Sequence, residues 1–229
     1  MTNARPIAFF DLDGTIVSDK SLISFYRVHL ERRHATDWEP RWEEVLREIR
    51  RRMDCDVDRM VLNRWFYETY FSGLAIDAAR AASRTWFERS LQRPDFFIRD
   101  VTQALFDHRS TGFGIVLVTG SFREVVAPIA EWLGADHALV APLEEAAGVY
   151  TGRLSGEAMI GRGKFNAVRR YLSTINVPAS DCYAYGDDRS DIPFLESVGH
   201  PVAVVSRSAP LNVDARERGW PILTIDAPG

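Results

Sequence analysis

Short apolar runs recur along the chain, and each is followed by a polar segment that carries turn residues or charges. Runs of this length, rich in β-branched and aromatic residues, are typical of strands buried on both faces of a parallel sheet. Between several of them, apolar residues recur at the helical spacing of three and four. This alternation predicts an α/β fold. The predicted strands are residues 7–10, 113–118, 138–141, 182–185, 202–205 and 222–225.

Residues 18–94 differ from their surroundings, because they carry helical stripes and no strand-like run. Aromatic residues in such stripes are usually packing, so we assign them to the interior of a helical bundle. We call this inserted bundle the cap and expect it to span residues 18–94, with residues 1–17 and 95–229 forming the α/β core. The four stripes are Leu22, Phe25, Tyr26 and Leu30; Trp42, Val45, Leu46, Ile49 and Met53; Val61, Leu62, Trp65 and Phe66; and Ile76, Ala79, Ser83, Trp86 and Phe87.

Three further elements are predicted after the cap. Residues 97–106 and 123–133 have helical periodicity, and Pro128 is expected to bend or break the second of these helices because it has no amide hydrogen. Residues 149–154 are expected to form one arm of a β-hairpin.

Polar side chains that can take part in binding or catalysis follow several of the predicted strands. Asp11 and Asp13 follow the first strand, and alternate residues of an extended chain face the same side, so both carboxylates can face one cleft. Thr119-Gly120-Ser121 follows the second long apolar run, and Gly186-Asp187-Asp188-Arg189-Ser190-Asp191 follows the run at 182–185. Because ligands bind at the carboxyl ends of strands in open α/β sheets, these ends are expected to converge on one pocket.

Lys164 opens a predicted helix, where the helix dipole disfavours a cation, and it is one of only two lysines among 28 basic residues. Lysine and arginine are not interchangeable where a compact charge is needed, so we interpret Lys164 as functional. Two other readings of the motifs fail. A calcium loop starting at Asp187 would need glycine and glutamate where Ile192 and Val198 stand. A nucleotide phosphate loop ending at Lys164 would need a serine or threonine at Phe165.

Taken in order, these motifs resemble those of the haloacid dehalogenase superfamily, in the branch that includes phosphoserine phosphatase. Asp11-x-Asp13-Gly14-Thr15, Thr119-Gly120-Ser121, Lys164 and Gly186-Asp187-Asp188-x-x-Asp191 match its four motifs. The resemblance implies a doubly wound, Rossmann-like parallel sheet with a helical cap. It also implies a Mg²⁺-dependent phosphatase that hydrolyses a small phosphate monoester.

The chemistry of phosphate esters fits these residue types. A carboxylate such as Asp11 can approach an anionic phosphate only if cations neutralise the charge, so Lys164 and Mg²⁺ are expected beside it. Attack by Asp11 gives an aspartyl-phosphate, and Asp13 serves as the general acid and base. Oxygen ligands suit Mg²⁺; we assign Asp11, the Asp13 carbonyl and Asp187 to the metal, with Asp191 holding a bound water. Thr119 and the amide of Gly120 are assigned to the phosphoryl oxygens.

Lys20 marks a departure from the family pattern. Phosphoserine phosphatases carry a glutamate shortly after the first motif to receive the substrate ammonium group, and this chain has Lys20 there. We therefore expect phosphoserine to be a poor substrate and the preferred one to present a carboxylate, hydroxyls or another anion to Lys20. The alternative is that Lys20 lies on the surface near the hinge. A phosphotransferase or mutase, and a silent protein that only binds a phosphorylated metabolite, remain alternative functions.

Composition limits the remaining possibilities. The net charge of −4 and the lack of a basic tail give no reason to expect a nucleic-acid partner. No apolar run approaches the roughly 20 residues needed to span a membrane, and no secretory apolar region develops before Asp11. The two cysteines, Cys55 and Cys182, are too few for a disulfide framework, so a cytoplasmic location is expected. The oligomeric state is not predicted.

Overall fold

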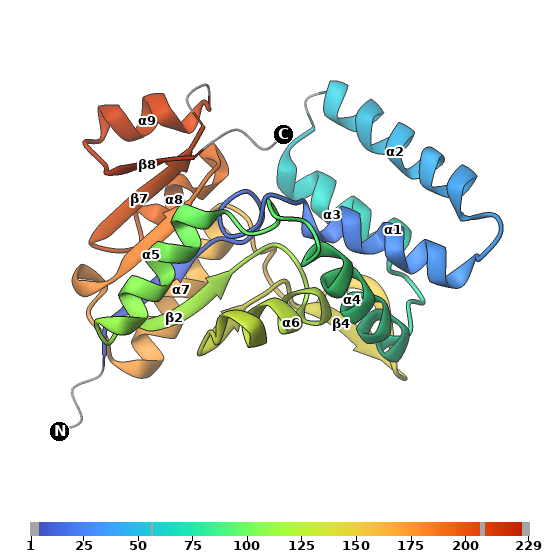
Figure 1. The fold of residues 1–229 in the computed structure, drawn as a ribbon, viewed down its shortest axis with the longest axis horizontal. Coiled ribbons are helices and arrows are strands. Elements are labelled where there is room, and N and C mark those ends of the chain that lie inside the picture. Colours follow the sequence, from blue (N-terminus) through green and yellow to red (C-terminus); the bar gives the residue numbers. More distant parts are fainter. Residues whose placement is uncertain (1–4, 56, 207–208, 226–229) are drawn as a thin grey trace.

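The computed structural model describes residues 5–55, 57–206 and 209–225 of the chain. Within them, six parallel strands form one sheet in the order β3-β2-β1-β6-β7-β8 (Figure 1). This confirms the predicted α/β fold with a doubly wound parallel sheet. The ends of the predicted core at residues 1–4 and 226–229 lie outside the described residues. The strands are β1 (Ile7–Phe10), β2 (Gly114–Val118), β3 (His137–Leu139), β6 (Tyr183–Gly186), β7 (His200–Val205) and β8 (Ile222–Thr224).

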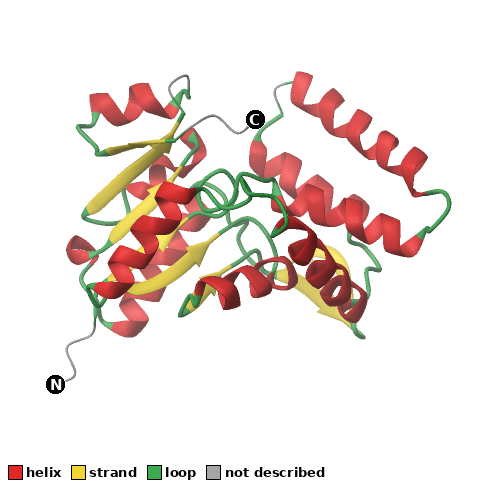
Figure 2. Ribbon diagram, in the orientation of Figure 1, coloured by secondary structure: helices red, strands yellow, loops and turns green. Residues whose placement is uncertain are grey.

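Both faces of the sheet are covered, which is why its central strands are apolar throughout (Figure 2). Along β1, Ala8 and Phe10 contribute to one apolar cluster, whereas Ile7 and Phe9 contribute to the other. The first cluster includes α5 (Arg99–Ser110) and α6 (Arg123–Leu133), and the second includes α7 (Arg162–Ile175), α8 (Ile192–Leu195) and α9 (Leu211–Glu217). The sheet is therefore a rigid platform for the loops at its edge.

Strand order reverses at β1, which has β2 on one side and β6 on the other. A reversal of this kind opens a crevice at the carboxyl ends of the strands, where ligands bind in open α/β sheets. The segments that begin at Asp11, Thr119 and Asp187 follow these three strands. The fold thus brings together residues more than a hundred positions apart in the sequence.

Helices α1 to α4 lie between β1 and α5 and gather beside the sheet in Figure 1. They are α1 (Ser21–Arg33), α2 (Trp38–Asp54), α3 (Arg59–Tyr70) and α4 (Ile76–Ser90), close to the predicted helices. Two backbone hydrogen bonds join the segments that enter and leave this insertion, from Ser18 N to Phe96 O and from Ile98 N to Ile16 O, both 2.9 Å. No helix in the described ranges combines the length and apolar character needed to cross a membrane.

The predicted hairpin is present as β4 (Leu143–Ala146) and β5 (Val149–Leu154), and it packs against the cap. Gly73 N donates to Tyr150 O at 2.8 Å, and Tyr150 N donates to Leu74 O at 2.9 Å. A third bond, from Ile76 N to Gly148 O, is 3.0 Å long. The segment between α3 and α4 is therefore held by a hairpin that comes from the second half of the chain.

Two predictions differ from the structure. The run at residues 138–141 was expected to be a core strand, but β3 is only three residues long, lies at the sheet edge and is partly exposed. Pro128 does not break α6, which continues from Arg123 to Leu133. Pro128 cannot donate to the carbonyl of Glu124 four residues earlier. That carbonyl instead accepts the hydroxyl of Ser83 at 2.5 Å, so the cap supplies the missing hydrogen bond.

Candidate active site

The loop after β1 turns sharply and leaves Asp11 and Asp13 at the sheet edge. Asp11 N donates to Tyr185 O of β6 at 2.9 Å, which continues the pairing of β1 one residue past the strand. Leu12 is fully buried, and its carbonyl accepts the amides of Ile16 and Val17, both at 2.9 Å. The alternation predicted from Asp-x-Asp is therefore present, with an apolar anchor between the two acids.

Gly14 is required by the geometry of this turn. Its φ is +93°, and a Cβ atom at this position would lie 2.2 Å from Asp187 Oδ2. The neighbouring Thr15 hydroxyl donates to Asp187 Oδ1 at 3.3 Å. The turn after β1 is thus shaped to receive the carboxylate that follows β6.

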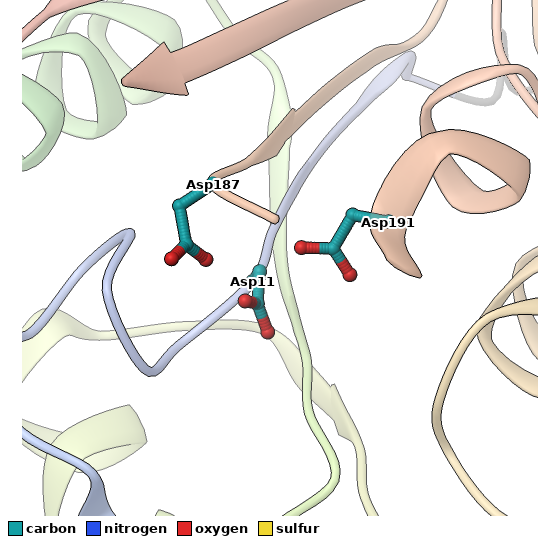
Figure 3. A group of neighbouring side chains, drawn as sticks. All are labelled: Asp11, Asp187 and Asp191. Carbon is teal, nitrogen blue, oxygen red and sulfur yellow. The ribbon is translucent and has the colours of Figure 1, made fainter. Parts of the chain in front are cut away.

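Three carboxylates, Asp11, Asp187 and Asp191, point toward one another from the loops after β1 and β6 (Figure 3). One oxygen atom from each lies within 4.8 Å of the others. Lys164, in the first turn of α7, donates to Asp11 Oδ1 and to Asp191 Oδ1, both at 2.7 Å. Lys164 is 5% exposed and Asp191 is 1% exposed, so the charges are screened little by water.

This crowding raises the pKa of all three of Asp187, Asp191 and Lys164, but for different reasons. Burial raises the pKa of Asp187, and the nearby Asp11 and Asp191 carboxylates raise it further. Burial also raises the pKa of Asp191. Burial alone would lower the pKa of Lys164, but the two carboxylates that it contacts raise that pKa above its ordinary value. The cluster therefore combines one charged lysine with three carboxyl groups.

Asp13 has a different environment. Burial raises its pKa to about 6, although hydrogen bonding to Ser21 and the charge of Lys20 act against this. The amide of Ser21, at the start of α1, donates to Asp13 Oδ1 at 3.1 Å. A carboxyl with a pKa near neutrality can exchange protons in both directions, as a general acid and base must.

The segment after β2 supplies neutral donors on the other side of Asp11. Ser121 N donates to Thr119 Oγ1 at 3.0 Å, and the hydroxyls of Ser121 and Ser21 are 2.6 Å apart. In the residues that the structure describes, the amide of Gly120 has no hydrogen-bond partner. Thr119 and Gly120 lie in the wall of the same small cavity as Asp11.

That cavity, which we call the catalytic cavity, has a volume of about 80 Å³. Ligand pockets are typically roughly 300–1,000 Å³, so this one matches a phosphoryl group rather than a whole metabolite. Asp11, Asp13, Thr119, Gly120, Lys164 and Asp191 all line it, whereas Asp187 and Lys20 do not; its other lining residues are Leu22, Arg59, Asn63, Ser121, Ile160 and Ser190.

Helix α3 of the cap contributes residues that the motif analysis missed. Arg59 pairs with Asp188 at 2.7 Å, and Asn63 Nδ2 and Tyr67 OH donate to Gly120 O at 3.4 and 2.6 Å. These three positions are spaced by four residues, so they share one helical face. The sequence signal for these residues is a polar stripe on a helix of an otherwise apolar bundle. A prediction based on the apolar positions of that helix alone does not include them.

Lys20 lies away from the catalytic cavity. Its ammonium group donates to the carbonyl oxygen of Asp13 at 3.3 Å. It lines a separate, larger cavity of about 420 Å³ together with Gly14 and Asp187. Lys20 thus lines a different cavity from Thr119 and Gly120.

The donor set fits a divalent cation. Three buried or half-buried carboxylates converge, one lysine does not balance their charge, and oxygen donors are those that Mg²⁺ prefers. The raised pKa of Asp187 is the expected result when such a cluster lacks a counter-charge. The residues present are therefore suited to Mg²⁺.

Comparison with known proteins agrees with this geometry. The model of the haloacid dehalogenase-like hydrolase family matches residues 8–196. The chain belongs to this family. It is 30% identical over 225 residues to a protein of Mycobacterium tuberculosis (strain ATCC 25618 / H37Rv) named as a probable phosphatase, covering 98% of this chain and 77% of the relative. It is 24% identical over 239 residues to a histidinol-phosphatase of Neisseria meningitidis serogroup C (strain 8013), covering 96% and 98%.

The family fold is also that of a solved, substrate-bound phosphoserine phosphatase. The two structures superpose with a TM-score of 0.67 at 18% identity, covering 96% of this chain and 92% of the other. The predicted membership in the haloacid dehalogenase superfamily is confirmed. The likeness to its phosphoserine phosphatase branch is also confirmed, because the chain is 29% identical over 223 residues to a phosphoserine phosphatase of Mycobacterium tuberculosis (strain ATCC 25618 / H37Rv), covering 94% of this chain and 69% of the relative. The chain is a phosphoric monoester hydrolase.

Proposed function

We propose that the protein is a Mg²⁺-dependent phosphatase that hydrolyses a small-molecule phosphate monoester through an aspartyl-phosphate on Asp11. The observation that carries this proposal is the position of Asp11, which contacts Lys164 at 2.7 Å and shares the catalytic cavity with Asp13, Thr119 and Gly120. Nucleophile, proton donor and oxyanion donors thus surround one space of phosphoryl size.

The proposed reaction has two displacements. A carboxylate oxygen of Asp11 attacks phosphorus, the ester P–O bond breaks, and Asp13 gives its proton to the leaving alkoxide. Asp13 then takes a proton from water, whose oxygen attacks the same phosphorus, and the P–O bond to Asp11 breaks to release phosphate. The pKa of about 6 allows Asp13 to perform both transfers near neutral pH.

Three groups are assigned to the phosphoryl oxygens. Lys164 supplies a charge that burial does not remove, because its two carboxylate contacts keep it protonated. The Thr119 side chain and the Gly120 amide supply neutral hydrogen bonds. Such fixed donors stabilise charge that develops in the transition state and need little reorganisation.

Asp11, the Asp13 carbonyl and Asp187 are proposed to hold Mg²⁺, with Asp191 holding a bound water. When bound, the metal neutralises part of the phosphate charge that would otherwise repel Asp11. Lys20 donates to the same Asp13 carbonyl at 3.3 Å.

The cap, proposed as residues 18–94 against a core of 1–17 and 95–229, is assigned to substrate selection. Arg59 and Asn63 are its polar contributions to the catalytic cavity. We retain Lys20 as a proposed specificity residue and phosphoserine as a disfavoured substrate. The change Lys20→Glu tests this directly: phosphoserine turnover should rise relative to that of anionic substrates. An unchanged ratio would remove Lys20 from substrate recognition.

The remaining proposals concern the location of the protein and its partners. We propose a cytoplasmic enzyme that acts on a small phosphorylated metabolite and has no nucleic-acid or membrane partner. Cys55 and Cys182 are both free thiols, which is compatible with a reducing compartment.

The deciding experiment measures phosphate release from a panel of phosphorylated alcohols, amino alcohols and sugars with Mg²⁺, beside an EDTA arm and Asp11→Asn. The proposal expects one compound to stand out and both controls to abolish release. Transfer of the phosphoryl group to an added alcohol would instead indicate a phosphotransferase. Binding of phosphorylated compounds without release or transfer would indicate a silent binding protein.

A further inference from the structure

The cap contains a second cavity that the proposed reaction does not use. Its volume is about 380 Å³, within the range of small-molecule sites. It lies between the last turns of α1 and the start of α4, and none of its lining residues lines the catalytic cavity. The residues around it are His29, Arg32, Arg33, Gly73, Leu74, Ala75, Ala78 and Ala81.

His29 is a buried polar side chain without a polar partner. It is 6% exposed and makes ring contacts with Phe25 and Tyr26, at 6.4 and 5.8 Å between centroids. Across the described residues no hydrogen bond to its imidazole is found. Burial, together with the charge of Arg33, lowers its pKa to about 4, so the ring is neutral at pH 7. The ring lines the cavity, so its nitrogens are available to a ligand that enters it.

The start of α4, where Ala75 and Ala78 line the same cavity, carries further unused donors. The N-cap residue, Ala75, has no side-chain acceptor. Ile76 N bonds to Gly148 O and Ala79 N bonds to Ala75 O, but the amides of Asp77 and Ala78 have no partner in the part of the chain that the structure describes. Free amides at the positive end of a helix favour an anion.

Two arginines complete the surroundings. Arg32 reaches from α1 to α4, where it donates to Thr85 Oγ1 at 3.2 Å. Among the described residues, neither Arg32 nor Arg33 forms an ion pair with a carboxylate. The acids on the neighbouring segments have other partners: Glu31 pairs with Arg27 and Arg89, and Asp77 pairs with Arg80 at 2.9 Å. The positive charge at the cavity is therefore not neutralised by the protein.

We propose that this cavity binds a small organic anion through a phosphoryl or carboxylate group. The group would accept hydrogen bonds from the first-turn amides of α4 and from His29, with Arg32 and Arg33 supplying charge. The cavity has room for more than a single tetrahedral anion, so an organic phosphate or a polycarboxylate fits it best. This site is distinct from the phosphoryl position beside Asp11 and does not depend on the proposed hydrolysis.

Proton NMR of the imidazole C2–H of His29 tests the proposal, with the signal assigned by its loss in His29→Gln. Pyrophosphate and citrate are titrated separately into metal-free protein at pH 7, with inorganic phosphate as a third probe. We expect pyrophosphate or citrate to shift the His29 signal saturably. The double variant Arg32→Ala/Arg33→Ala should weaken this binding about tenfold or more.

The matched control removes two other exposed arginines of the cap, in Arg47→Ala/Arg50→Ala, and should leave the titration unchanged. A His29 signal that does not move, or one that moves equally in both double variants, would overturn the proposal. Phosphate release is measured in parallel and should be unaffected by Arg32→Ala/Arg33→Ala. A protein that lacks phosphatase activity would therefore leave this test intact.

Discussion

Lys164 in the core and His29 in the cap are buried to almost the same extent, 5% and 6% exposed, but the protein treats them in opposite ways. Lys164 has two carboxylate partners, which raise its pKa and keep it charged. His29 has aromatic neighbours and nearby arginines, and its pKa falls to about 4. The comparison shows that burial alone does not decide protonation, because the partners of each group set the direction of its pKa shift.

The same contrast separates the two regions by role. At the sheet edge, the carboxylates and Lys164 are held by strand ends and by one another, so their positions are fixed before substrate arrives. Facing them, α3 contributes side chains that bond to a backbone carbonyl or to a partly exposed acid. Changes in the core should therefore abolish turnover, whereas changes in the cap should modulate it.

The largest effect is expected from Asp11→Asn, because the amide is a far weaker nucleophile than the carboxylate. The kcat should fall by about 10⁴-fold or more. Steady-state phosphate release measures the loss, and mass spectrometry of acid-quenched protein should show a phosphorylated Asp11 in the wild type only. Asp107→Asn, an exposed change on α5, is the control. Substantial turnover by Asp11→Asn would remove Asp11 as the nucleophile.

Lys164→Met tests whether the core depends on its buried cation. The change leaves Asp11 and Asp191 without their ion-pair partner, so the free energy of unfolding in EDTA should fall by about 3 kcal/mol. Denaturant unfolding measures this fall, and kcat should drop by about 10³-fold.

Added Mg²⁺ should restore more stability to Lys164→Met than to the wild type, because it becomes the main counter-charge of the carboxylates. The matched control is Lys20→Met, which changes the other, exposed lysine. It removes one hydrogen bond to the Asp13 carbonyl and a charge that lowers the pKa of Asp13 and Asp187, but no contact with a carboxylate. Equal effects of the two substitutions on stability would contradict the role assigned to the buried pair.

The core site could be predicted well from the sequence because each of its residues belongs to a short local pattern. Asp11 and Asp13 follow an apolar run, and Lys164 opens a helix, so each residue could be placed on an element without knowing its neighbours. The parallel order of β2, β1 and β6 then brings the strand ends together. What local pattern could not give was the pairing itself, such as the contact of Lys164 with Asp191 rather than with Asp187.

The cap was harder to predict because its polar contacts depend on how it packs against the core. Tyr67 lies among the apolar positions of α3, yet its hydroxyl reaches Gly120 O. Ser83 was assigned to a packing stripe, but its hydroxyl satisfies the carbonyl that Pro128 leaves free in α6. Both contacts join residues more than 40 positions apart, so no window of sequence contains them.

Tyr67→Phe tests how much the cap contributes to the site through its hydrogen bond to Gly120. It removes the 2.6 Å bond to Gly120 O but leaves the ring packing in place. The free energy of unfolding should fall by about 1 kcal/mol, and kcat/KM should fall about fivefold because Gly120 is less firmly held. Tyr70→Phe, on the same helix, is the control, since no hydrogen bond to the Tyr70 hydroxyl is found among the described residues. A loss as large as that of Asp11→Asn would contradict the division of roles.

His29 is expected to affect the pH dependence of stability and to leave turnover unchanged. Its pKa is about 4 in the folded protein and about 6.5 when unfolded, so the unfolded state binds more protons between these values. The contribution of His29 to the free energy of unfolding should be complete above pH 6.5 and should be lost as the pH falls toward 4. This contribution is at most about 3 kcal/mol.

In His29→Gln this part of the decline should disappear, whereas His34→Gln, a partly exposed change just after α1, should retain it. Denaturant unfolding across this pH range, in buffers free of phosphate and carboxylates, provides the measurement. An anion in the cap cavity would favour the protonated imidazole and flatten the wild-type curve. Identical pH slopes in the wild type and His29→Gln would mean that the cap, like the core, supplies its buried basic group with a partner.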